Sequence, residues 1–105
     1  MITATVLKDL NGIYQGFSVQ GHALFDEKGK DIVCAAVSIL TINTVNSIEQ
    51  LTDSDLSVQT DEGITCKFRK QPDDKAVILM DSFLLGLKGI EQEHADYFRL
   101  VIEEV

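Results

Sequence analysis

Residues 31–40, DIVCAAVSIL, decide the fold that this sequence predicts, because the hydrophobic period changes there from that of a strand to that of a helix. Apolar residues recur at the spacing of one helix face: Ile32, Val33, Ala36, Val37, Ile39 and Leu40. Asp31 is a favoured N-cap residue, since a carboxylate can accept the free amides of the first turn. We therefore predict a helix from Asp31 to about Leu51, where Thr52-Asp53-Ser54-Asp55 marks a turn.

The segments on both sides of this helix alternate between apolar and polar residues, as half-buried strands do. Strands are predicted, in chain order, over residues 2–6, 13–20, 56–60, 64–69 and 97–104. Asn11-Gly12 separates the first two strands and is a strong hairpin signal, because both residues tolerate positive φ. Residues 21–30 show no clear period and end in a charged run, so we expect a surface loop there.

A second helix is predicted over residues 75–94, directly after the strand-breaking segment Gln71-Pro72-Asp73-Asp74. The element order is therefore β-β-α-β-β-α-β, and no strand–helix–strand unit repeats often enough for a doubly wound parallel sheet. The predicted fold class is α+β, a mainly antiparallel sheet with two helices on one face. A chain of 105 residues suits a single domain spanning 1–105.

The chain is acidic, with 9 Lys+Arg against 17 Asp+Glu and a formal net charge of −8. It lacks the cationic surface that nucleic-acid binding needs, so we expect no direct nucleic-acid partner and an attraction to basic proteins. The first residues lack a signal-peptide pattern, and the most apolar stretch, 76–87, contains Asp81 and is too short to span a bilayer. We therefore expect a cytoplasmic protein with no membrane partner, whose two cysteines are thiols.

Cys34 is the most informative residue for chemistry. If Asp31 is the N-cap, Cys34 is the third helical residue, where unpaired amides carry partial positive charge. A thiolate is favoured in that field, which would make Cys34 a better nucleophile. The other interpretation is a small buried hydrophobe, as free cysteines usually are. Cys66 shares a strand face with Ile64 and Phe68, so packing alone explains it.

His22 precedes Cys34 at the end of the second predicted strand, and a strand end and the next helix start lie naturally close. A histidine there can take the thiol proton and form a Cys–His pair. The alternative is a solvent-exposed loop histidine. His94 lies near the end of the second predicted helix, where a cation suits the helix dipole, and needs no functional role.

Three further residues are candidates for supporting roles. Ser38 lies one turn after Cys34 and can hydrogen-bond a thiolate, a substrate or His22, or bond back to the carbonyl of Cys34. Asp31 can orient His22 as well as cap the helix. Gly21 is either a hinge for a loop that closes over a substrate or a plain turn residue.

The sequence offers no cofactor or metal motif. It contains no C-x-x-C pair and no phosphate-cradling glycine loop, so we expect neither a cofactor nor a metal. The second predicted helix is apolar around most of its circumference, more than one small sheet can cover. A homodimer interface is therefore a second reading of this helix, beside its role in the core.

Gly21-His22-Ala23 followed by residues 31–38, DIVCAAVS, resembles the ribosomal-processing cysteine protease family (Prp, also called YsxB-like). Residues 86–90, GLKGI, resemble the second helix of that family. The resemblance implies a cytoplasmic, homodimeric endopeptidase that removes the N-terminal extension of a large-subunit ribosomal protein and so supports ribosome maturation. It implies Cys34 as the nucleophile, His22 as the base and a loop between them that moves when substrate arrives.

Two other functions remain open from the residues themselves. The chain can be a non-enzymatic α+β dimer that acts as a binding or assembly module, in which Cys34 is only packed. It can also be a thiol redox sensor, although Cys66 is committed to the predicted core and no other cysteine is present to resolve an oxidised Cys34.

Overall fold

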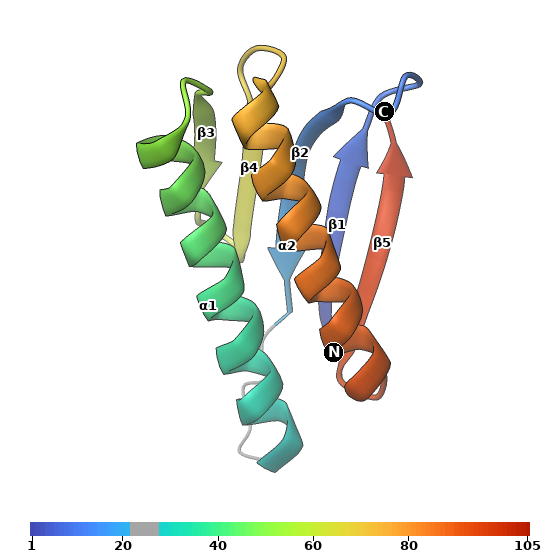
Figure 1. Ribbon diagram of the computed structural model, residues 1–105. Helices are drawn as coiled ribbons and strands as arrows, with labels where there is room; N and C mark the ends of the chain where they lie inside the picture. The colour runs from blue at the N-terminus through green and yellow to red at the C-terminus, as the bar shows by residue number, and fades with distance from the viewer. Residues whose placement is uncertain (22–27) are drawn as a thin grey trace.

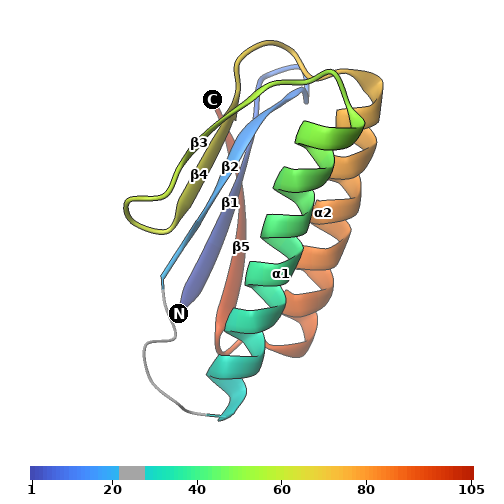
Figure 2. The ribbon, with the colours of Figure 1, turned by 90° about the vertical axis from the view of Figure 1, so that its left-hand side faces the viewer.

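The computed structural model describes the backbone of residues 1–21 and 28–105 and the side chains of residues 1–21 and 32–105. In that part of the chain, five strands form one sheet in the order β3-β4-β2-β1-β5. Both helices lie on the same face of this sheet, with α1 toward β3 and β4 and α2 toward β1 and β5 (Figures 1 and 2). The elements are β1 Ile2–Lys8, β2 Tyr14–Gln20, α1 Lys28–Leu51, β3 Leu56–Gln59, β4 Ile64–Phe68, α2 Asp74–Glu93 and β5 Phe98–Glu104.

The predicted α+β fold and its element order are confirmed. Strands β1 and β2, β2 and β4, and β3 and β4 pair antiparallel. The exception is β5, which pairs parallel to β1 from Ile2 opposite Phe98 to Lys8 opposite Glu104. Helix α2 makes this possible, because it carries the chain back across the sheet so that β5 enters in the direction of β1.

The first hairpin forms as predicted, but its turn differs from the expected pair of residues with positive φ. Only Gly12 has a positive φ, of 78°, while Asn11 keeps an ordinary backbone conformation. The carboxylate of Asp9 accepts the amides of Asn11 at 2.8 Å and Ile13 at 3.0 Å. These bonds stabilise a longer turn, which needs the left-handed conformation at glycine alone.

Helix α1 begins at Lys28, which makes the predicted start at Asp31 wrong. Residues 28–30, expected in a loop, form its first three positions. Lysine is a good helix former, and the sequence has no proline nearby that would end the helix. Asp31 is thus the fourth residue of the helix and not its N-cap. Cys34 becomes the seventh residue, nearly two turns into α1.

The segment Ile32–Leu51 of α1 is long and apolar enough to cross a membrane by length and composition alone. This segment is longer than the apolar stretch 76–87, which is too short to span a bilayer. Several polar groups in α1 are satisfied within the helix, since Thr41 and Thr44 donate to the carbonyls of Val37 and Leu40 at 2.7 and 2.8 Å. Its buried side chains are part of the domain core, as expected of a core helix.

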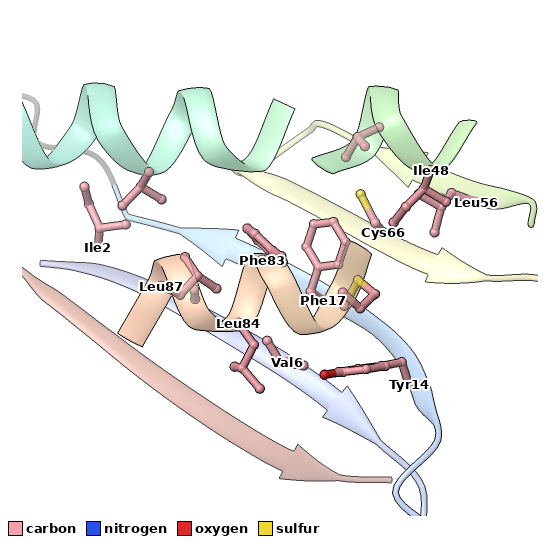
Figure 3. Close-up of a cluster of buried hydrophobic side chains, with 14 of the residues drawn as sticks. Ile2, Val6, Tyr14, Phe17, Ile48, Leu56, Cys66, Phe83, Leu84 and Leu87 are labelled. Carbon is pink, nitrogen blue, oxygen red and sulfur yellow. The ribbon is translucent and has the colours of Figure 1, made fainter. Parts of the chain in front are cut away.

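The core lies between the helices and the helix-facing side of the sheet (Figure 3). The rings of Phe17 on β2 and Phe83 on α2 pack with centroids 4.8 Å apart and planes tilted by 59°. The two helices approach closely at Gly86, where a Cβ atom would lie 2.7 Å from Cδ2 of Leu40. Glycine at this position therefore allows α1 and α2 to pack closely against each other.

Candidate active site

Cys34 lies on a cleft of about 290 Å³ beside the first half of α1. Its side chain is half-buried and packs against the edge of the core. Helix α1 contributes one wall of the cleft at the positions expected of a single helix face: Cys34, Val37, Ser38, Thr41 and Ile42. The thiol is therefore accessible to a ligand while its Cα is held by a helix packed on the core.

The opposite wall comes from strand ends that are far apart in the sequence. Ile2 begins β1, and Ile64 begins β4. Val19 lies near the end of β2, and Gly21 directly follows that strand. The turn between β3 and β4 adds Thr60, Asp61 and Gly63, which we did not predict as site residues. Because β4 pairs with β2 from Val19 opposite Ile64, the turn is brought to the same end of the sheet as Gly21. The sequence indicated only a turn at these residues and did not indicate that this turn lies near Cys34.

Ser38 shares the cleft with Cys34, as predicted from the spacing of one helical turn. Thr41, one turn further, uses its hydroxyl to bond the carbonyl of Val37. Within the described residues, the Ser38 hydroxyl makes no such bond to the carbonyl of Cys34. The side chain of Ser38 is exposed, so its hydroxyl is available to a ligand in the cleft.

The electrostatic environment of Cys34 differs from the predicted one, because α1 begins earlier than expected. Amides beyond the first four of a helix already bond to carbonyls one turn earlier, and the dipole acts mainly within the first turn. Cys34 is the seventh residue, so in the described helix it lies beyond the first turn whose amides are unpaired. The position of Cys34 in the helix therefore does not by itself favour the thiolate.

Cys66 lies in the opposite situation, as predicted. It is fully buried on β4, on the helix-facing side of the sheet near Phe17 (Figure 3). Burial raises the pKa of the Cys66 thiol to about 11, and the negative charge of Glu49 adds to the rise. At neutral pH Cys66 is thus an uncharged packing residue, which leaves Cys34 as the accessible cysteine of the two.

Gly21 holds the chain in a conformation that other residues rarely adopt. Its φ is +89°, and a Cβ atom there would overlap the carbonyl oxygen of Met1. Gly21 is therefore required where β2 leaves the sheet at the cleft. His22, the predicted base, and the rest of the predicted loop up to residue 27 lie outside the described residues, as does the side chain of Asp31.

The described part of the chain holds no group of three or more His, Cys, Asp or Glu side chains arranged to bind a metal. His94 is the C-cap of α2, and its amide donates to the carbonyl of Ile90 at 2.8 Å. Its predicted place at the helix end is confirmed. An accessible thiol on a small, mainly apolar cleft is an arrangement that thiol-dependent hydrolases use.

The sequence as a whole matches known proteins of that class. Residues 1–99 match the family model described as cysteine protease Prp. The chain is 30% identical over 107 residues to the ribosomal processing cysteine protease Prp of Bacillus subtilis, covering 95% of this chain and 96% of that protein. It is 29% identical over 103 residues to the Staphylococcus aureus Prp, covering 95% and 97%. The chain therefore belongs to the ribosomal processing cysteine protease family, Prp, and the resemblance found in its sequence is confirmed.

Solved structures share the fold. The S. aureus protease Prp with a covalently linked product peptide superposes with a TM-score of 0.87 at 27% identity, covering 98% of this chain and all of that one (100%). The same S. aureus protease with a substrate peptide gives a TM-score of 0.84 at 28% identity, with the same coverage. A Streptococcus mutans protein gives 0.85 at 32% identity, covering 100% and 99%.

Proposed function

We propose that this chain is a cysteine endopeptidase that removes the N-terminal extension of a large-subunit ribosomal protein, with Cys34 as nucleophile and His22 as base. The observation that carries the proposal is the accessible thiol of Cys34 on the cleft. Gly21, the residue directly before His22 in the sequence, lines the same cleft. The S. aureus relative holds a covalently linked product peptide, which fits acyl-enzyme chemistry in this family.

The proposed reaction has two steps. The Cys34 sulfur, after giving its proton to His22, attacks the carbonyl carbon of the scissile peptide bond. The carbon–nitrogen bond then breaks, His22 returns the proton to the leaving amine, and a thioester remains on Cys34. In the second step His22 takes a proton from water, the hydroxide attacks the thioester, and the acid product and the thiol are released.

The exposed hydroxyl of Ser38 supports this chemistry as a hydrogen-bond donor inside the cleft. We propose that it bonds the substrate or the sulfur, since it lies one turn from Cys34. Asp31, whose proposed role is to orient His22, is joined to Cys34 by one continuous helix. The first-turn amides are not part of this proposal, because Cys34 lies beyond them.

The substrate we propose is a basic protein. The net charge of −8 attracts a basic ribosomal protein over a distance and raises the encounter rate. The negative charge also disfavours binding to ribosomal RNA, so we propose that cleavage acts on the free protein before assembly, in the cytoplasm. A salt series tests this: we expect the cleavage rate to fall at high ionic strength, and an unchanged rate would remove the electrostatic part.

The decisive experiment uses peptides that copy the N-termini of the organism's own large-subunit ribosomal proteins. We expect the purified chain to cleave one of them at a single bond, read by mass spectrometry. Cys34→Ala should abolish cleavage and leave the circular dichroism spectrum unchanged. Cleavage that persists in Cys34→Ala would refute the mechanism, and cleavage of none of the peptides would favour a binding module.

We further propose that the protein is a homodimer. Helix α2 exposes Ile78 and Leu85 by 67% and 71%, and their spacing of two turns puts them on one face. Ile39 on the neighbouring helix is 69% exposed. A second copy of the chain would cover such apolar side chains. Sedimentation should show a dimer that Ile78→Glu with Leu85→Glu converts to a monomer, and a monomeric native chain would refute the proposal.

A further inference from the structure

The cleft beside Cys34 is apolar except for a few groups, and one of them is charged. Among the described residues that line it, Asp61 is the sole charged side chain. Asp61 belongs to the turn between β3 and β4, on the wall across from α1. Of the described residues, a peptide held between these walls therefore meets one carboxylate, and it lies on the wall across from α1.

The turn that carries Asp61 is held against the sheet. Gly63, two residues further, has a φ of +82°, and a Cβ atom there would overlap the carbonyl oxygen of Val19. The strands on either side of the turn are paired, with Gln59 opposite Thr65 and Val19 opposite Ile64. The backbone that carries Asp61 is thus anchored to the sheet on both sides of the turn, beside the cleft.

We propose that Asp61 determines substrate specificity, by favouring a Lys or Arg side chain and rejecting Asp or Glu at the substrate position that lies against the β3–β4 turn. The inference rests on the proposed proteolytic function and adds a charge requirement at one position of the cleaved segment. Its physical basis is the Coulomb attraction between the carboxylate and a cation, and the matching repulsion of an anion. Asp61 is exposed, so the preference is moderate and depends on salt.

Glu62 provides a matched control. It follows Asp61 on the same turn and is also exposed, but it is not among the residues that line the cleft. Asp61→Asn and Glu62→Gln each remove one negative charge and keep the shape of the side chain. If the acidic surface as a whole attracts the substrate, both substitutions should change cleavage equally. If a carboxylate in the cleft recognises the substrate, only Asp61→Asn should change it.

The experiment is a positional scan. In the peptide that the native protein cleaves, each residue near the scissile bond is replaced in turn by Lys, Gln and Glu, and kcat/KM is measured. We expect one position at which Lys exceeds Gln by up to about fivefold, the upper end of the effect of an exposed ion pair, and Glu falls below Gln. Asp61→Asn should remove this preference at that position and no other, and Asp61→Lys should invert it.

Glu62→Gln should keep the native preference. An equal loss in Glu62→Gln, or an unchanged preference in Asp61→Asn, overturns the inference and leaves the proteolytic function standing. If the native protein cleaves no peptide, the proposed function fails independently of this inference. Binding is then measured instead: fluorescein-labelled peptides that carry Lys or Glu are titrated with the Cys34→Ala variant and followed by fluorescence anisotropy. A Lys preference that is lost when Asp61→Asn is added would support the role of Asp61, and equal or absent binding of the two peptides would overturn it.

Discussion

Gly21 at the end of β2 lies directly against the carbonyl oxygen of Met1, so that residue 21 has no room for a Cβ atom. Its φ of +89° adds a second reason for glycine at this position. Two strands of the sheet are thereby brought together at the cleft, one residue before His22 in the sequence. Gly21, which the sequence left as a hinge or a turn, is in this structure a point of close packing beside the cleft.

We expect Gly21→Ala to destabilise the fold and to lower the cleavage rate, because both the strained φ and the overlap with Met1 must be relieved by moving the chain. The cost should be about 2–3 kcal/mol in the free energy of unfolding, measured with urea. Gly12→Ala is the matched control, since Gly12 also has a positive φ, of 78°, but no atom within 4 Å of an added Cβ. Equal costs for the two variants would show that the contact with Met1 is unimportant.

The two cysteines should differ in reactivity and in their effect on stability. Because Cys34 lies on the cleft and Cys66 is fully buried, we expect iodoacetamide at neutral pH to label Cys34 first and Cys66 only after unfolding. Cys66→Ala should cost about 1–2 kcal/mol of stability through the cavity it leaves and keep peptide cleavage. Peptide mapping by mass spectrometry gives the labelling order, and equal labelling of both thiols would contradict the assignment.

Ser38→Ala should lower kcat/KM for the cleaved peptide about tenfold, the effect of losing one hydrogen bond to a substrate or a thiolate. The stability of the protein should change little, because the Ser38 side chain is exposed and has no hydrogen bond to any residue that the structure describes. Thr41→Val is a useful comparison, since the Thr41 hydroxyl is already bonded to the carbonyl of Val37. Full activity in Ser38→Ala would exclude a role in catalysis.

Stability should depend on alkaline pH through Cys66. The pKa of its thiol is raised to about 11 by burial, whereas an unfolded thiol titrates near pH ~8.5. The stabilisation by the neutral thiol is therefore fully present below about pH 8.5 and is lost as the pH rises toward about 11. We expect the free energy of unfolding to fall over this window, and to fall less in Cys66→Ala.

Urea titrations at several pH values across the window measure that difference. Burial and the hydrogen bond to Asp81 also raise the pKa of Tyr14, but Tyr14 is present in both proteins, so comparing them isolates the thiol. The same slope in native protein and Cys66→Ala would contradict the assigned cause.

The two glycines of α2 should respond oppositely to alanine. Nothing lies within 4 Å of an added Cβ on Gly89, so Gly89→Ala should stabilise the helix by up to about 1 kcal/mol. On Gly86 the added Cβ would lie 2.7 Å from Cδ2 of Leu40, and Gly86→Ala should gain less or destabilise. Thermal unfolding of the two variants tests this, and an equal gain in both would mean that the helices can separate freely.

Local patterns determined most of the elements. Alternation and the 3.6-residue period depend on neighbouring side chains, so both helices, all five strands and their order were predictable. The burial of Cys66, on a strand face with the partly buried Ile64 and Phe68, was predictable for the same reason. Cys34 and Ser38 were predictable as neighbours on one face, because helical spacing alone relates them. The family resemblance depended on short motifs for the same reason.

Tertiary structure decided the rest. Only packing placed β5 parallel to β1, and only the pairing of β4 with β2 brought Asp61 to the wall across from Cys34. The start of α1 at Lys28 also escaped the sequence, since the capping signal of Asp31 is a weak preference that a continuing helix overrides. The physical reason is range: periodicity is set by residues a few positions apart, whereas the two walls of the cleft meet through strand register and helix packing between distant segments.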